Sequence, residues 1–181
     1  MDSHLSRFYP FDDSASQILG FVDSTEAAEI GRYGAELYFN DLLSGINGGV
    51  KNNKVVQAEP GSDLNLTIDR KIQAEAERIL KKIIEDYRAE AGSVIVEEPQ
   101  TGKILAMGSF PNFDPNDYSK FNIADFRNPV IQGIYEPGSV FKLITMSAGI
   151  DSGKITPDTT YIDTGSFTAN AKTINNWDYK T

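Results

Sequence analysis

Two residues whose types can do nucleophilic chemistry stand three positions apart in the last third of the sequence, Ser139 and Lys142. A serine hydroxyl is a weak nucleophile at neutral pH and needs a base beside it. A lysine amine that loses water on burial is more easily deprotonated, and the neutral amine can accept the hydroxyl proton. Because residues three apart on a helix share a face, the spacing predicts Ser139 as an acylated nucleophile and Lys142 as its base.

The segment that would position both residues is predicted to be a helix from Ser139 to Ile150, between Pro137-Gly138 and Gly153. Its residues leave almost no polar face, and a helix that is apolar all round is normally buried. Burial of an unpaired ammonium group costs several kcal/mol. A lysine inside such a helix therefore indicates a chemical role.

A structural interpretation of the same four residues is also open. From average composition, a chain of this length contains about one S-x-x-K match by chance. Ser139 could then simply cap the helix, and Lys142 could extend its aliphatic stem along the helix so that the amine reaches water.

Composition excludes several other classes of function. With 17 basic and 26 acidic residues the chain carries a net charge of -9, which argues against nucleic-acid binding. It has no cysteine, so disulfides and thiolate metal sites are excluded, and the single histidine, His4, makes a histidine triad or a metal site improbable. No stretch is long and apolar enough for a membrane span, and the polar start lacks the pattern of a secretory signal. The chain is therefore expected to be cytoplasmic or a piece of a longer protein.

The middle of the chain has the clearest secondary-structure pattern. Leu64 to Ile68 alternates apolar and polar residues and predicts a strand, and Asp69 can cap the long amphipathic helix that follows and ends at Gly92. Ser93 to Val96 and Lys103 to Met107 then predict two antiparallel strands joined by a turn. The residues that follow are loop-like.

The first sixty residues are more mixed. Ser24 is the predicted N-cap of a helix that starts at Thr25 and includes Ile30. A second helix is predicted from Tyr33 to Leu43. Ser44 to Lys54 is rich in Gly and Asn and predicts a loop or a hairpin tip. Pro60-Gly61-Ser62-Asp63 is a predicted turn, and it divides the chain into domains of residues 1–60 and 61–181.

Several segments together resemble class B penicillin-binding proteins. The segment around the serine, Y-E-P-G-S-V-F-K at 135–142, closely resembles the active-site segment of that family. L-N-L-T-I-D at 64–69 with Gln73, P-Q-T-G-K-I-L-A-M at 99–107, S-F-P-N-F-D-P-N at 109–116 and Arg127-Asn128-Pro129 are similar to its transpeptidase domain. Residues 15–22 and 31–36 resemble the end of its non-catalytic pedestal, although the family usually has Gly-Leu-Glu where this chain has Gly34-Ala35-Glu36. S-x-x-K is a known signature of these proteins and of class A β-lactamases.

The resemblance implies an α+β fold, part of the penicillin-binding transpeptidase and β-lactamase-like fold, with an antiparallel sheet and a buried nucleophile helix. Residues 1–60 would be the C-terminal part of a pedestal domain, and residues 61–181 the N-terminal part of a transpeptidase domain. It also implies that Ser139 attacks the penultimate D-alanine of a peptidoglycan stem peptide, or a β-lactam, and that no metal or organic cofactor takes part. Proteins of the elongation or division complex are possible partners, at the extracytoplasmic face of the bacterial plasma membrane.

The resemblance also implies two further motifs, Ser-x-Asn and Lys-Thr-Gly, which do not occur after Ser139 in this sequence. The chain is therefore expected to be an internal fragment, and an inactive one, because part of the oxyanion hole would be missing. The alternatives that remain are a serine β-lactamase or penicillin sensor of the same fold, and a non-catalytic cell-wall scaffold.

Overall fold

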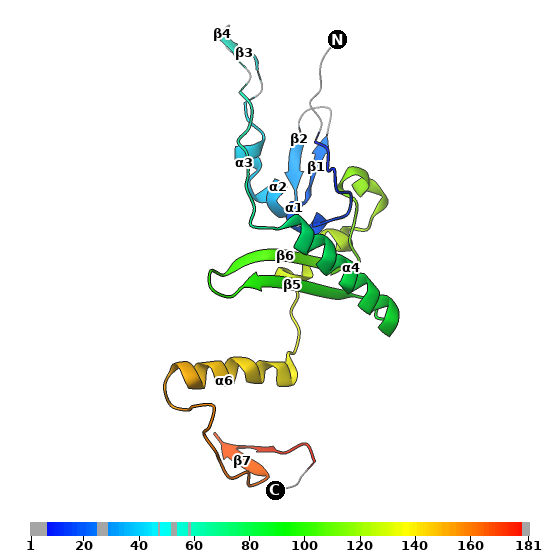
Figure 1. The fold of residues 1–181 in the computed structure, drawn as a ribbon. Helices are drawn as coiled ribbons and strands as arrows, with labels where there is room; N and C mark the ends of the chain where they lie inside the picture. The colour runs from blue at the N-terminus through cyan, green and yellow to red at the C-terminus, as the bar shows by residue number, and fades with distance from the viewer. Residues whose placement is uncertain (1–6, 25–28, 47, 52–53, 58, 179–181) are drawn as a thin grey trace. The chain divides into compact units, whose positions relative to one another are not determined.

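The computed structural model describes residues 7–24, 29–46, 48–51, 54–57 and 59–178, so His4 lies outside the described residues. Helices and antiparallel strands alternate along the chain, which confirms the α+β class (Figure 1). The chain forms two compact units, Met1–Ile134 and Tyr135–Thr181, which are described separately. The domain boundary predicted near residue 60 is a different division and stays a prediction.

The first unit contains five helices, two 3₁₀ segments and six strands among its described residues. Its helices are α1 (Ser16–Leu19), α2 (Gly34–Tyr38), α3 (Asn40–Leu43), α4 (Arg70–Tyr87) and α5 (Pro129–Gln132), and its 3₁₀ segments are η1 (Pro115–Lys120) and η2 (Ile123–Phe126). The strands pair as three antiparallel hairpins: β1 (Phe21–Ser24) with β2 (Glu29–Arg32), β3 (Gly49–Lys51) with β4 (Lys54–Val56), and β5 (Gly92–Glu98) with β6 (Lys103–Phe110).

Helix α4 is the longest helix of the first unit, and its start is encoded locally. The Asp69 side chain accepts hydrogen bonds from the Lys71 and Ile72 amides at 2.8 and 3.1 Å, as predicted for an N-cap. The helix ends at Tyr87, several residues before Gly92, because Arg88 takes the left-handed conformation (φ 53°) that terminates helices. Its buried face lies against the β5–β6 hairpin.

Two glycines bring α4 close to the hairpin. A Cβ atom on Gly92 would lie 3.1 Å from a Leu80 methyl group, and one on Gly108 would lie 3.2 Å from the Glu77 side chain. Each glycine therefore leaves room for a helix side chain directly above the strand. Ala106, opposite Val96 in the ladder, is fully buried.

The edge of β6 that does not pair with β5 is covered by polar groups from the residues around the start of α4. The Gln73 side chain, only 2% exposed, accepts a hydrogen bond from the Met107 amide and donates one to the Met107 carbonyl, both at 2.9 Å. The Asp69 amide donates to the Leu105 carbonyl at 2.8 Å. A helix side chain thus replaces the backbone partner that a neighbouring strand would supply.

The N-terminal part of the chain contributes to an aromatic core. Phe21 of β1 stacks on Tyr118 with ring centroids 4.1 Å apart, and Phe126 lies 5.0 Å from Phe21 in an edge-to-face arrangement. Phe113, which is fully buried, contacts both Phe21 and Phe126. Such offset and edge-to-face pairs add to the stability gained by burying the rings.

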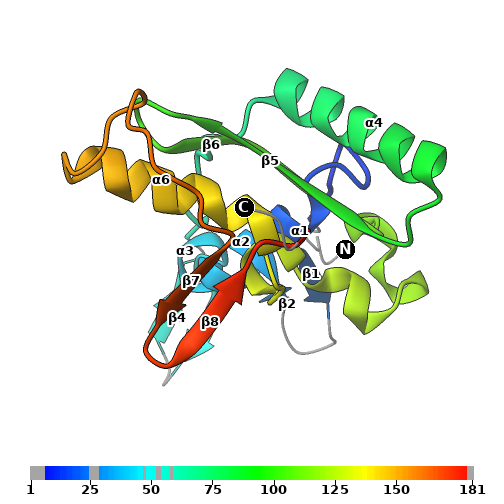
Figure 2. The ribbon, with the colours of Figure 1, turned by 90° about the horizontal axis from the view of Figure 1, so that it is seen from below.

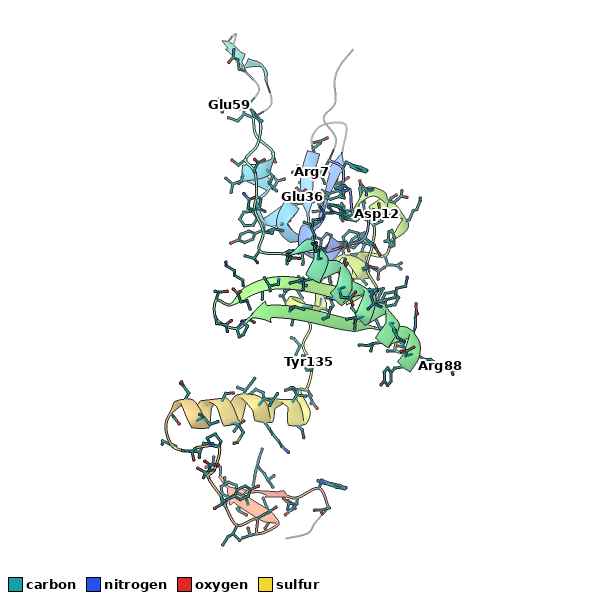
Figure 3. All side chains as sticks on the ribbon, in the orientation of Figure 1. Arg7, Asp12, Glu36, Glu59, Arg88 and Tyr135 are labelled. Carbon is teal, nitrogen blue, oxygen red and sulfur yellow. The ribbon has the colours of Figure 1, made fainter. Side chains whose placement is uncertain are left out.

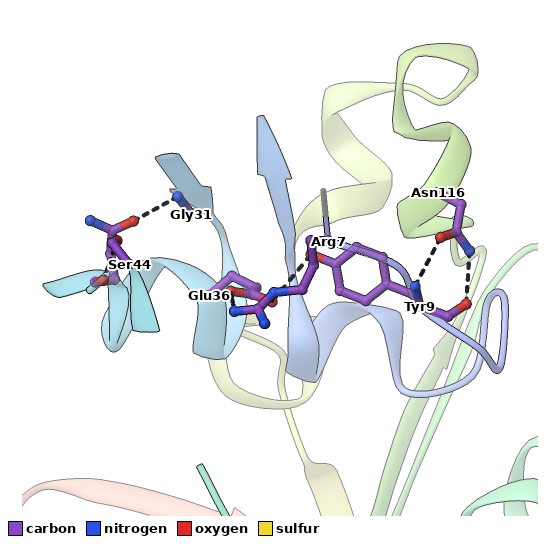
Figure 4. A network of polar contacts seen from close by, with 7 residues as sticks. Arg7, Tyr9, Gly31, Glu36, Ser44 and Asn116 are labelled. Atoms are coloured by element: carbon purple, nitrogen blue, oxygen red, sulfur yellow. Dashed lines mark hydrogen bonds and ion pairs between the residues drawn. The ribbon is translucent and has the colours of Figure 1, made fainter. Parts of the chain in front are cut away.

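Glu36 on α2 is a buried carboxylate with two partners (Figure 4). Arg7 approaches it with two nitrogens, Nε at 2.9 Å from Oε1 and Nη2 at 3.2 Å from Oε2, the paired geometry that strengthens Arg–carboxylate contacts. The Tyr9 hydroxyl donates to Oε1 at 3.2 Å. Burial, followed by the negative charge of Glu36, raises the pKa of Tyr9 well above its usual range.

The raised pKa of Tyr9 predicts a loss of stability in alkali. Above pH 10, the ordinary pKa of tyrosine, the unfolded chain releases the Tyr9 proton while the folded chain keeps it. This contribution to stability is fully present below pH 10 and is lost as the pH rises toward the folded-state pKa. Above pH 10, the free energy of unfolding should fall less steeply with pH in Tyr9→Phe than in the wild type. The two slopes should differ by about 1.4 kcal/mol per pH unit. Urea titrations from pH 9 to 11 measure the slope. Tyr38→Phe, at a tyrosine that is 82% exposed, should leave it unchanged; equal slopes in both variants would contradict the assignment.

The second unit, Tyr135–Thr181, has a 3₁₀ turn (η3, Gly138–Val140) that continues into helix α6 (Phe141–Asp151), followed by strands β7 (Ser166–Ala169) and β8 (Lys172–Asn175). β7 and β8 form an antiparallel hairpin (Figure 2), a closing element that the sequence did not predict. Asp163 accepts hydrogen bonds from the Gly165 amide and the Asn176 side chain, and these two bonds lower the pKa of its carboxyl.

Two predicted elements are wrong. Residues Glu29–Arg32 pair with β1, so Ile30 is part of a strand and not of a helix capped by Ser24; residues 25–28 lie outside the described residues. Pairing with Phe21–Ser24 overrides the weak helix propensity of this short segment. Residues 64–68 form no strand, although Thr67 donates from its hydroxyl to the Ile104 carbonyl at the edge of β6.

Candidate active site

Ser139 lies in the 3₁₀ turn directly before α6, and Lys142 is the second residue of that helix. Gly138, just before the serine, has a φ of +55°, a conformation that glycine adopts without strain. The first backbone hydrogen bond of the turn joins the Val140 amide to the Pro137 carbonyl at 3.2 Å. The Ser139 amide thus precedes the hydrogen-bonded turn, at the positive end of the α6 dipole.

Both side chains are exposed, and in the part of the chain that the structure describes no hydrogen bond joins them. The helix itself matches its predicted position, 139–150, to within two residues at its start and one at its end. The roles of Ser139 as nucleophile and Lys142 as base stay predictions.

The prediction that this helix is buried is wrong for this chain, because nearly all residues of α6 are exposed. Leu143 is 71% exposed and Ile144 59%, and among the residues of α6 only Gly149 is half-buried, against the Ile155 side chain. The physical reason is the size of the unit. A segment that begins at Tyr135, labelled in Figure 3, and offers one short hairpin has too little chain to cover a helix that is apolar on all sides.

The residues before Tyr135 are tied to the β5–β6 hairpin by Asn128, which is buried. Its side-chain oxygen accepts from the Val130 amide at 3.1 Å and so caps α5, while its side-chain nitrogen donates to the Met107 sulfur at 3.2 Å. The backbone amide of Asn128 donates to the side-chain oxygen of Gln132 at 2.9 Å. These contacts give a local structural role to one member of the predicted Arg127-Asn128-Pro129 motif.

Two aspartates make local contacts in the 3₁₀ segment η1. Asp114 accepts from the Asn116 backbone amide at 2.8 Å and caps the segment, and Asp117 forms an ion pair with Lys120. Sequence reasoning missed the polar side chains that join distant segments, such as Gln17 and Glu77. Their only sequence signal is a polar residue beside an apolar one, which is too common to single them out.

Other kinds of site are not indicated by the described residues. Within these ranges, no group of three His, Cys, Asp or Glu side chains could hold a metal ion. None of the helices described is both long enough and apolar enough to cross a membrane. A cavity of about 640 Å³ in the first unit is lined by Arg7, Glu36 and Asn40 among others, but its buried carboxylate is already paired with Arg7 and Tyr9.

The sequence of this chain is similar to those of known proteins. The family model of the penicillin binding protein transpeptidase domain matches residues 92–181. The probable peptidoglycan D,D-transpeptidase PbpC of Pseudomonas aeruginosa is 37% identical over 160 residues, which cover 82% of this chain and 28% of that protein. The peptidoglycan D,D-transpeptidase FtsI homolog of Chlorokybus atmophyticus is 30% identical over 186 residues, which cover 97% of this chain and 27% of that protein.

Two solved structures have a similar fold. A crystal structure described as a putative peptidoglycan glycosyltransferase from Atopobium parvulum has a TM-score of 0.80 and 34% identity, and the match covers 97% of this chain and 40% of that one. Penicillin Binding Protein 2X from Streptococcus thermophilus has a TM-score of 0.71 at 24% identity, over 96% of this chain and 28% of that one, and shows a shared fold. The chain thus spans between about a quarter and two fifths of these relatives. Since the family model, the curated relatives and the fold agree, the chain belongs to the penicillin-binding protein transpeptidase family.

Proposed function

We propose that the intact protein is a penicillin-binding serine D,D-transpeptidase that cross-links peptidoglycan stem peptides through an acyl-enzyme on Ser139. The observation that carries this proposal is the placement of Ser139 immediately before α6 with Lys142 in the first turn of that helix. Both residues lie within the segment matched by the transpeptidase model. The printed names of the relatives, peptidoglycan D,D-transpeptidases, support the reaction class.

In the proposed first step, Lys142 accepts the proton of the Ser139 hydroxyl while the serine oxygen attacks the carbonyl of the penultimate D-alanine. A C–O bond forms, the amide C–N bond then breaks, and the terminal D-alanine leaves as an amine with the transferred proton. The negative charge on the carbonyl oxygen is greatest between these two events. Unpaired amides at the start of α6, including that of Ser139, can donate to it.

In the second step, an amine of a neighbouring stem peptide attacks the ester carbon. The new amide bond is the cross-link, and the serine hydroxyl is restored as the ester C–O bond breaks. A β-lactam enters the first step as an analogue of the stem peptide, and opening of its ring leaves the same type of ester. The peptidoglycan substrate places the proposed activity at the extracytoplasmic face of the plasma membrane, where elongation or division proteins are the proposed partners.

The test is to locate the ester formed by penicillin on the intact protein. Trypsin cleavage after Arg127 and Lys142 releases residues 128–142, and in that peptide Ser139 is the only serine or threonine. After brief exposure to penicillin, the expected mass increase of one intact penicillin falls on this peptide. An adduct on any other peptide, or none at all, would refute the proposal. Rapid release of hydrolysed penicillin would instead support a β-lactamase.

A further inference from the structure

Gly138, the residue before Ser139, is the point at which the backbone changes hand. Pro137 before it has φ −72° and ψ −17°, and Val140 after it has φ −62° and ψ −30°, both right-handed, whereas Gly138 has a φ of +55°. All of these residues lie in the second unit, together with Lys142. The inference below rests on the proposed function, because it concerns how readily Ser139 is acylated.

The glycine at this position is required by its conformation and not by a lack of space. Among the described residues, no atom beyond the two chain neighbours lies within 4 Å of a Cβ built on Gly138. A left-handed φ is nevertheless unfavourable for an L residue, because its Cβ comes too close to the following carbonyl oxygen. Gly34 also has a positive φ, but a Cβ there would lie 2.4 Å from the Ile18 carbonyl oxygen. At Gly138, conformation alone accounts for the glycine.

The left-handed φ ends the helical turn on its N-terminal side and leaves the Ser139 amide available. The Val140 amide donates to the Pro137 carbonyl at 3.2 Å, and the Phe141 amide donates to the Gly138 carbonyl. In the described part of the chain, no backbone carbonyl accepts from the Ser139 amide. A longer helix would supply as acceptors the carbonyls of the two residues before Pro137. The left-handed residue interrupts the helix before those carbonyls are reached.

The free amide of Ser139 has a use in the proposed reaction. When the serine oxygen attacks, negative charge develops on the substrate carbonyl oxygen, and an amide donor beside it stabilises that charge. Loss of one such donor typically lowers a rate by about 10² to 10³. A right-handed residue at 138 would let the helix extend toward its N-terminal side. The Ser139 amide would then bond to a backbone carbonyl and not to the substrate.

We propose that Gly138 is a positioning residue, whose left-handed backbone keeps the Ser139 amide free for the substrate and thereby sets the rate of Ser139 acylation. Gly138 does not touch substrate in this proposal, and it acts through the residue that follows it. Lys142 lies on the other side of Ser139, along the helix, so its place relative to the serine does not depend on φ at 138.

Gly153 supplies a matched control at the other end of the same helix. It follows α6, has a φ of +66°, and a Cβ built on it would likewise have no non-neighbouring atom within 4 Å among the described residues. Its amide donates to the Ile150 carbonyl at 2.9 Å. An L residue at 153 therefore strains the backbone in the same way as one at 138, but at the end of α6 remote from Ser139.

The experiment uses the intact protein and four variants, Gly138→Ala, Gly138→Asn, Gly153→Ala and Gly153→Asn. Asparagine adopts left-handed conformations more readily than alanine, although its side chain is larger. A backbone effect therefore makes alanine the worse substitution, whereas obstruction of the substrate makes asparagine the worse one. The time course of labelling by fluorescent penicillin at a saturating concentration yields the fraction of protein that labels and the rate constant for that fraction.

The expected rate constant is about tenfold below the wild-type value in Gly138→Ala and about threefold below it in Gly138→Asn. It should be unchanged in both Gly153 variants. The tenfold figure follows from the preference of alanine for right-handed over left-handed backbone, which is about tenfold in population. The smaller loss in Gly138→Asn is a rescue by backbone preference, which a merely structural or steric role would not produce.

Three results would overturn the inference. These are a loss in Gly138→Asn as large as that in Gly138→Ala, an equal loss in the Gly153 variants, and an unchanged rate constant in Gly138→Ala whatever its labelled fraction. If Gly138→Ala leaves no folded protein to label, Gly138→Asn decides, because it should still label more slowly than Gly153→Asn. Wild-type protein that does not label at Ser139 would instead refute the proposed function.

Discussion

Ser139→Ala should show no covalent labelling by penicillin in the intact protein, whereas Ser147→Ala should label as the wild type does. The alanine variant lacks the oxygen that forms the ester, so a complete loss is expected and not a partial one. Ser147 is the matched control because it is an exposed serine on the same helix, where its hydroxyl donates to the Leu143 carbonyl at 2.8 Å. Gel fluorescence after incubation with a fluorescent penicillin measures the outcome.

Lys142 is tested in the same assay, because the two residues are proposed to act as a pair. Removal of a general base typically lowers a rate by about 10² to 10⁴. Lys142→Ala should therefore label slowly, with Lys154→Ala as an exposed control on a neighbouring turn. Labelling of Ser139→Ala at the wild-type rate would remove that residue from its proposed role. If Lys142→Ala were labelled at the wild-type rate, Lys142 would not be the base that activates the Ser139 hydroxyl.

Phe113→Ala should lower the free energy of unfolding by about 3–5 kcal/mol, the usual cost of truncating a fully buried phenylalanine. The ring is 0% exposed, and its centroid lies 5.9 Å from that of Phe21, 4.8 Å from Phe126 and 6.4 Å from Phe121. A cavity at this position would remove contacts to Phe21 of β1, to Phe126 of η2 and to Phe121, which lies between η1 and η2. Urea unfolding followed by circular dichroism measures the change.

Phe8→Ala is the matched control for Phe113→Ala. Phe8 is 71% exposed, so truncation of its ring should change the free energy of unfolding by no more than about 0.5 kcal/mol. Similar losses in the two variants would mean that the aromatic cluster does not hold the first unit together. Hydrogen exchange should also show where the loss falls, with faster exchange around both Phe21 and Phe126 in Phe113→Ala.

The elements that the sequence predicts well are those whose signals are local. Helix α4 combines a periodic apolar face with an aspartate that caps it, and both act within a few residues. The β5–β6 hairpin is likewise marked by a tight turn between two apolar runs. Position and type were predictable there because nothing distant competes with the local preference.

Other parts could not be predicted because distant partners decide them. Ile30 lies in a segment with helix-like spacing, but hydrogen bonds to β1 make it a strand. The burial of α6 depends on what surrounds it, and in this chain Leu143 and its apolar neighbours remain exposed. Composition alone predicts that other segments must pack around such a helix, but it does not show which segments these are.

The hydrogen bonds made around Tyr9 and Gln17 could not be predicted from the sequence for a different reason. Asn116 and its partner Tyr9 are 107 residues apart, and Gln17 is 94 residues from Pro111. An amide side chain has no propensity that indicates such a partner. Ser139 and Lys142 could be proposed from the sequence because their spacing is itself the signal, whereas Asn116 and Gln17 have no such spacing.

The side-chain amide of Gln73 also bears on whether a second copy of this protein could pair with the edge of β6. An exposed strand edge is a template on which another chain can build a strand, and such contacts lead to aggregation. On β6, the amide and carbonyl of Met107 are already bonded to Gln73, and the Leu105 carbonyl is bonded to Asp69. A foreign strand would have to displace a buried side chain before it could bind there. The residues around the start of α4 thus protect this edge of β6 from pairing with another strand.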